Sequence, residues 1–127
     1  MGKRTWIKVY CDKWVSGTLR DETPEIRCCW IDLLALVGNS QNSDTGELKL
    51  ANGIGYSDEQ ISDILRIEIP LWLKAKQRFV DTDRIILSSK NEIAIKNWTK
   101  YQSEYSRQKP YRNKEKSLHS KEREVRL

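Results

Sequence analysis

The sequence predicts a small α+β domain followed by a basic C-terminal tail. Two patterns predict the domain: apolar residues recur at steps of three and four in several segments, and two short β-prone runs follow them. Charge predicts the tail, because residues 106–127 hold eight basic and three acidic residues, whereas residues 1–105 hold fifteen of each. We therefore expect one domain at residues 1–105, and a basic tail or linker toward a further C-terminal region at residues 106–127.

The N-terminal third predicts one strand and one helix. Residues 6–11 (WIKVYC) alternate with a period of two, which favours a short strand. Thr23 then offers a hydroxyl N-cap, and Pro24 suits a first helical turn. Apolar residues recur along residues 26–37 at steps of three and four, so they predict a core helix that ends at Gly38.

Cysteine usage indicates a reducing compartment. The three cysteines have no CxxC spacing, and the polar N-terminus does not resemble a secretory leader. We therefore expect a cytoplasmic protein with no membrane partner. Cys28 and Cys29 are interpreted as small core fillers rather than as redox or metal-binding thiols.

The middle of the chain predicts a helix pair. A short strand candidate at residues 47–50 comes first, and Ser57 with Gln60 then forms the capping box of a second helix. A third helix is expected from about Pro70 to Asp81. Its inner face would hold Trp72, Ala75 and Phe79, and its outer, mostly basic face Leu73, Lys74, Gln77, Arg78 and Asp81.

A hairpin and a last helix complete the domain. Residues 84–88 and 92–96 are β-prone runs, and the three polar residues between them suit a hairpin turn. Asn97 would cap one more short helix, from Trp98 to about Gln108, which Pro110 should end.

Two helices around a short turn, with a basic outer face and a following hairpin, predict a winged helix-turn-helix, a three-helix core with a β-hairpin wing. In that architecture the second helix of the pair enters the major groove, and the wing lies against the backbone or the minor groove. The candidate DNA contacts are Lys74, Gln77 and Arg78 on the helix and Arg84, Lys90 and Lys96 on the wing.

The alternative for this face is a solvated surface or a protein-docking module. Asp81 and Asp83 would repel phosphate, which counts against a deep fit in a groove. The residues by themselves favour neither alternative.

The tail interleaves basic and aromatic residues, a mixture that follows a nucleic acid backbone and offers rings to unpaired bases. A soluble linker is the favoured alternative for residues 111–127, because so polar a segment buries little apolar surface. The candidate contacts here are Arg107, Lys109, Arg112, Lys114 and Lys116.

Several chemistries are excluded by the residues present. The single histidine, His119, lies in the tail, so the domain cannot assemble a Ser-His-Asp triad or a histidine zinc site. Gly53 and Gly55 belong to no phosphate-binding motif. Acidic residues near Asp58 are explained by the helix dipole rather than by a metal. We therefore expect no catalytic residue, no metal and no cofactor, and a protein that is not an enzyme.

Five stretches resemble the N-terminal domain of phage replisome organiser proteins, related to DnaD-like primosome proteins. They are WIKVY, WIDLLALVG, GYSDEQISDIL, LWLKAKQRFVDTDRI and EIAIKNWTKYQSEYSRQKPYR. The resemblance extends over about residues 4 to 115. The resemblance implies a winged-helix fold and a role in initiating phage DNA replication. It further implies that the protein recognises origin DNA and helps to recruit the replicative helicase or its loader.

The prediction is thus a non-enzymatic DNA-binding module of a phage or prophage replication initiator. Its expected partners are double-stranded origin DNA and the helicase or loader, with single-stranded DNA and a homo-oligomer as further alternatives. Two other classes stay open: a winged-helix transcriptional regulator, and an oligomerisation or docking module without DNA contact.

Overall fold

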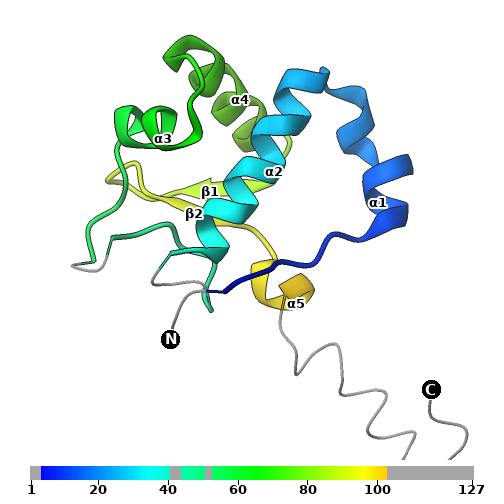
Figure 1. Cartoon of the computed structure of the whole chain (residues 1–127), viewed down its shortest axis with the longest axis horizontal. Helices are drawn as coiled ribbons and strands as arrows, with labels where there is room; N and C mark the ends of the chain where they lie inside the picture. The colour runs from blue at the N-terminus through cyan, green and yellow to red at the C-terminus, as the bar shows by residue number, and fades with distance from the viewer. Residues whose placement is uncertain (1–3, 41–43, 51–52, 103–127) are drawn as a thin grey trace, which may run out of the picture. The chain divides into compact units, whose positions relative to one another are not determined.

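The computed structural model describes residues 4–40, 44–50 and 53–102 (Figure 1). The chain divides into two units, Met1–Lys96 and Asn97–Leu127, which are described separately. The first unit combines helices with a two-stranded antiparallel sheet, so the predicted α+β class is confirmed. Across the described ranges, none of the helices is long and apolar enough to cross a bilayer.

The predicted strand at residues 6–11 is wrong. Residues 6–10 form no helix or strand, and a short helix, α1 (Cys11–Ser16), begins where the strand should end. The amide of Trp14 donates to the carbonyl of Tyr10 at 2.9 Å, which starts the helix. A Cβ at Gly17 would lie 2.4 Å from the carbonyl oxygen of Lys13, so only glycine allows the chain to turn from α1 into the 3₁₀ helix η1 (Thr18–Asp21).

The first core helix, α2 (Pro24–Gly38), is confirmed with its predicted cap. The hydroxyl of Thr23 accepts a hydrogen bond from the amide of Ile26 at 3.3 Å, and Pro24 lies in the first turn. The apolar stripe faces inward, since Ile26, Cys29, Leu33 and Val37 are each at most 2% exposed.

The predicted strand at residues 47–50 pairs only through isolated bridges. Glu47 bridges to Ala94, and the amide of Leu48 donates to the carbonyl of Ile93 at 2.9 Å. Lys49 then bridges to Gly55, so the chain folds back on itself after one step of pairing. The segment still lies beside the hairpin, and Leu48 is fully buried.

The helix pair consists of α3 (Asp58–Leu65) and α4 (Ile69–Asp81). The capping box is confirmed: the amide of Gln60 donates to Ser57 Oγ at 3.1 Å, and the amide of Ser57 donates to Gln60 Oε1 at 2.8 Å. Arg66 closes α3 in the left-handed conformation, with φ 58°. Residues 66–68 therefore connect the two helices.

The predicted hairpin is confirmed as β1 (Ile85–Leu87) and β2 (Ile93–Ile95). The strands are antiparallel, with Ile86 opposite Ala94. Asn91, in the turn, has φ 64°, a left-handed conformation that asparagine tolerates better than most residues.

Helix α4 is central to the packing of the first unit. It packs against α2, α3 and β1. Its inner residues Trp72, Ala75 and Phe79 are fully buried as predicted, and the Phe79 ring meets Trp30 edge to face at 5.1 Å. The arrangement of helix pair and hairpin is compatible with a winged helix.

The second unit contains α5 (Trp98–Gln102). The amide of Tyr101 donates to the carbonyl of Asn97 at 3.2 Å, and Trp98 and Gln102 are buried. The predicted extension of this helix to about Gln108, and the basic tail at 106–127, lie outside the described residues.

Candidate nucleic acid interface

The outer face of α4 is exposed, as predicted. Leu73, Lys74, Gln77, Arg78 and Asp81 are all exposed. The ammonium of Lys74 has no partner among the described residues, whereas Gln77 Nε2 donates to Asp81 Oδ1 at 2.8 Å. On this face, Lys74 is therefore available to a ligand, whereas Gln77 and Asp81 are bonded to each other across one turn of the helix.

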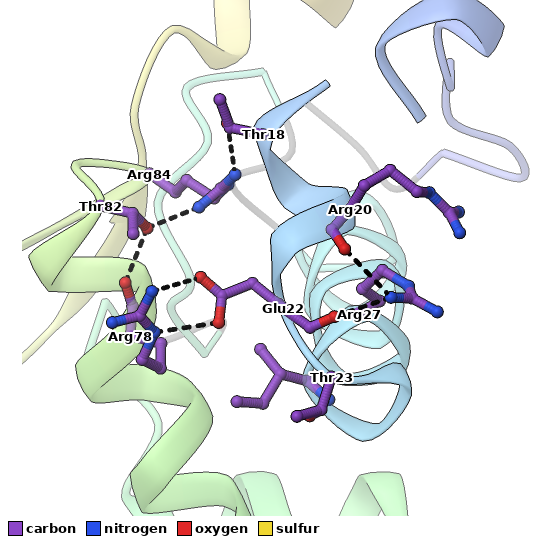
Figure 2. A network of polar contacts seen from close by, with 9 residues as sticks. Thr18, Arg20, Glu22, Thr23, Arg27, Arg78, Thr82 and Arg84 are labelled. Carbon is purple, nitrogen blue, oxygen red and sulfur yellow. Dashed lines mark hydrogen bonds and ion pairs between the residues drawn. The ribbon is translucent and has the colours of Figure 1, made fainter. Parts of the chain in front are cut away.

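Arg78 forms a two-pronged ion pair with Glu22 (Figure 2). Its Nε donates to Oε1 at 2.9 Å and its Nη2 donates to Oε2 at 2.6 Å. Glu22 lies between η1 and α2, and its side chain is 6% exposed, whereas the side chain of Arg78 is 44% exposed. The hydrogen bonds from Arg78 hold the pKa of Glu22 below its usual value, so this carboxylate is charged at neutral pH.

Arg84 belongs to the same polar network (Figure 2). Its Nη1 donates to Thr82 Oγ1 at 2.6 Å and its Nη2 donates to Thr18 Oγ1 at 2.9 Å. The Thr82 hydroxyl in turn donates to the carbonyl of Arg78 at 2.6 Å. Burial lowers the pKa of Arg84, which indicates a guanidinium partly withdrawn from solvent. Arg84 therefore links the end of α4 to η1.

The two hairpin lysines differ in availability. Lys90 is exposed in the turn between β1 and β2, and its ammonium has no partner among the described residues. Lys96 follows β2 and forms an ion pair with Asp83. A phosphate could reach Lys90 directly but would have to displace a carboxylate at Lys96.

The candidates on the first unit therefore form three groups. Arg78 is paired with Glu22 and is linked to Arg84 through Thr82. Gln77 and Lys96 are each bonded to an aspartate. Lys74 and Lys90 remain available within the described ranges. The tail candidates lie beyond the described residues; they are Arg107, Lys109, Arg112, Lys114 and Lys116.

A buried lysine on α4 was not predicted. Lys76 is 7% exposed, and its ammonium donates to Asp58 at 2.9 and 3.2 Å and to Asn91 Oδ1 at 3.1 Å. Trp72 Nε1 also donates to Asp58 Oδ1, at 2.8 Å. Burial alone would raise the pKa of Asp58, but these hydrogen bonds outweigh it and lower the pKa. Since Lys76 follows Trp72 by four residues, its place in the apolar stripe was the available signal.

Glu22 was also missed, because no local pattern pairs it with Arg78, 56 residues away. It stands just before the helix-start signal Thr23-Pro24, in a segment whose structure the sequence did not predict. Its burial and its partner depend entirely on tertiary packing.

The described part of the chain was also compared with the requirements of a metal site and of a reactive thiol. No cluster of three or more His, Cys, Asp or Glu side chains there could hold a metal ion. Cys29 is buried, as predicted, and burial raises its pKa to about 11. Cys28 is exposed rather than in the core, and the charge of Asp32 raises its pKa. Neither pKa favours a reactive thiolate.

Comparison with known proteins identifies the family of the chain. The family model described as N-terminal phage replisome organiser matches residues 6–124, nearly the whole chain, which includes the helix pair, the hairpin and the tail candidates. No curated protein and no solved structure matches. This chain belongs to the N-terminal phage replisome organiser family, which indicates a role in phage replication.

Proposed function

We propose that this chain is a winged-helix DNA-binding module of a phage replication initiator, without enzymatic activity of its own. It would recognise origin DNA and help to recruit the replicative helicase or its loader. The observation that carries the proposal is the outer face of α4, which stays exposed while the inner face is fully buried. In a replication protein, an exposed helix with cations is suited to a DNA groove.

The order of elements supports the winged-helix assignment. Helix α2 is followed by a segment around Glu47 that pairs with β2, then by α3, α4 and the β1–β2 hairpin. The hairpin comes directly after α4, which is where a wing would lie beside the same duplex. The boundary between domain and tail near residue 105 is part of this proposal.

The candidate residues take different roles in the proposed complex. Lys74 and Lys90 are the most direct phosphate contacts, because their ammonium groups have no partner among the described residues. Gln77 and Arg78 are the candidate base readers. Arg84 and Lys96 would support the wing and reach phosphates only by rearranging, since each already has partners. The basic tail would add phosphate contacts.

The intramolecular acidic partners favour a second candidate, a docking or oligomerisation module. Glu22, Asp81 and Asp83 each engage one candidate DNA contact, which reduces the positive field of this surface. This candidate predicts no duplex binding at physiological salt and a molecular mass that rises with concentration.

Binding measured by fluorescence anisotropy tests the proposal. The whole chain would be titrated into a labelled duplex at about 50 and about 200 mM salt, and we expect affinity to fall steeply with salt. Lys74→Ala should weaken binding to every sequence about equally. Arg78→Ala should mainly reduce the preference for origin over random DNA. Equal loss on both duplexes with Arg78→Ala would remove the base-reading role, and no binding at either salt concentration would favour docking.

A further inference from the structure

We infer that Glu22 is a positioning residue, which orients the guanidinium of Arg78 so that its free edge faces two adjacent acceptors on DNA. The guanine edge, with O6 and N7, is the pair to which we assign it. This inference rests on the proposed function and names a determinant of its specificity.

The hydrogen-bond geometry leaves one edge of Arg78 available. A guanidinium carries five N–H donors, and Glu22 accepts from Nε and from one hydrogen of Nη2. Both hydrogens of Nη1 and the second hydrogen of Nη2 remain without a hydrogen bond in the described part of the chain, where the charge of Asp81 also acts on this guanidinium. Those two nitrogens form the second fork of the group, the one that binds an acceptor pair in two-pronged fashion.

The supporting carboxylate is itself held in place. The backbone amide of Glu22 donates to the carbonyl of Leu19 at 3.0 Å, and the carbonyl of Glu22 accepts from Arg27 Nη1 at 2.7 Å. Thr23, the next residue, is the N-cap of α2. Glu22 therefore lies at a fixed junction between η1 and α2 (Figure 2), and its buried side chain projects toward α4.

The exposure of the two partners fits this role better than a purely structural one. The carboxylate is buried and the arginine side chain is 44% exposed, so the ion pair has a protein side and a solvent side. An exposed long side chain normally samples several rotamers, and ordering it costs free energy on binding. With Glu22 in place the arginine is ordered before DNA arrives, which favours discrimination among bases.

Charge distinguishes positioning from simple attraction. Glu22 partly cancels the charge of Arg78, so its removal should not weaken attraction to phosphate. Loss of orientation should instead reduce the preference for one sequence. Positioning thus predicts that preference and non-specific affinity change independently, whereas a structural role predicts that both fall together.

The experiment compares two duplexes of equal length: one enriched by in vitro selection with the whole chain, and one of random sequence. The variants are Glu22→Gln, Arg78→Ala, Arg78→Lys and the double variant Glu22→Gln/Arg78→Ala. We expect Glu22→Gln to lower the preference for the selected duplex about tenfold. Its binding to the random duplex should stay equal or increase. The double variant should match Arg78→Ala, because Glu22 acts on the preference only through Arg78 and its replacement has no further effect once Arg78 is gone.

Two measurements keep the test independent of folding. Arg78→Lys retains the charge, but an ammonium cannot make the two-pronged contact of a guanidinium. This variant should therefore lose the preference for the selected duplex, while its circular dichroism spectrum remains that of the wild type. The Nε–H resonance of Arg78 should be resolved in the NMR spectrum of the wild type and broaden in Glu22→Gln.

Each other outcome overturns the inference. If Glu22→Gln retains the preference, or lowers binding to both duplexes alike, Glu22 does not position Arg78, while the proposed function stands. If the wild type binds neither duplex, the proposed function and the inference fail together. If selection enriches no sequence although duplex DNA is bound, Arg78 reads no base and the inference fails, while DNA binding itself stands.

Discussion

The ammonium of Lys76 lies 2.9 Å from Asp58 Oδ1, so a buried lysine of α4 is tied to the first residue of α3. The same ammonium donates to Asn91 in the hairpin turn at 3.1 Å. One cation thus connects the two helices of the pair to the hairpin, three elements that the proposed function requires in a fixed arrangement.

Replacing Lys76 with Met should destabilise the protein by about 2 kcal/mol, because the partly buried carboxylate of Asp58 then has no cation beside it. Lys74→Met, two residues away on the exposed face, should change the free energy of unfolding by less than about 0.5 kcal/mol. Urea denaturation, monitored by circular dichroism, compares the free energy of unfolding of the two variants. Equal effects would show that the Lys76 network contributes nothing specific.

Acid should destabilise the protein through Glu22 and Asp58. The pKa of each is lower in the folded state than its ordinary value, which is 4.5 for Glu22 and 3.8 for Asp58. The stabilisation is therefore present above those values and is lost as pH falls through the folded pKa. Urea unfolding at about pH 6, 4 and 3 should show a shallower decline for Glu22→Gln and for Asp58→Asn. A decline as steep as that of the wild type would assign acid sensitivity to other groups.

Replacing Arg66 with Gly should stabilise the protein by about 0.5–1 kcal/mol. Arg66 ends α3 with φ 58°, a conformation that costs free energy for a residue with a Cβ. Arg66→Ala removes the same side chain but keeps the Cβ, so it should not stabilise. Thermal unfolding of both variants separates backbone relief from the effect of removing the side chain, and equal midpoints would contradict the prediction.

The tail should set much of the salt dependence of DNA binding. Replacing its five candidate cations with Gln should lower the slope of log affinity against log salt by about 0.9 for each phosphate that the tail no longer neutralises. These cations are Arg107, Lys109, Arg112, Lys114 and Lys116. A variant with residues 107–127 in shuffled order keeps the charge and should keep the slope. An unchanged slope in the Gln variant would support the linker alternative.

Elements with local signals could be predicted from the sequence. The caps at Thr23 and Ser57 depend on residues within one turn, and both helices begin where predicted. The inner face of α4 followed from periodicity, and the hairpin from two β-prone runs around a polar turn. Each of these patterns is complete within about fifteen residues of sequence.

Elements that depend on distant partners could not be predicted in the same way. Alternation at residues 6–11 suggested a strand, but a strand needs a neighbouring strand, and residues 4–10 pair with none in the described ranges. The candidate site shows the same limit. Exposure of Lys74 and Arg78 followed from helical geometry, whereas the partner of Arg78 comes from a segment 56 residues earlier. A helix pattern predicts which face is exposed but not which carboxylate lies across from it.

The bridge between Glu47 and Ala94 also protects the sheet against aggregation. Because β2 pairs with β1 on one side and with residues 46–48 on the other, both of its backbone edges are occupied. Strand addition from another molecule would therefore have to use β1, which is only three residues long. So short an edge is a poor template for intermolecular pairing. The single step of pairing at Glu47 thus reduces the risk that copies of this domain associate through the edges of their hairpins.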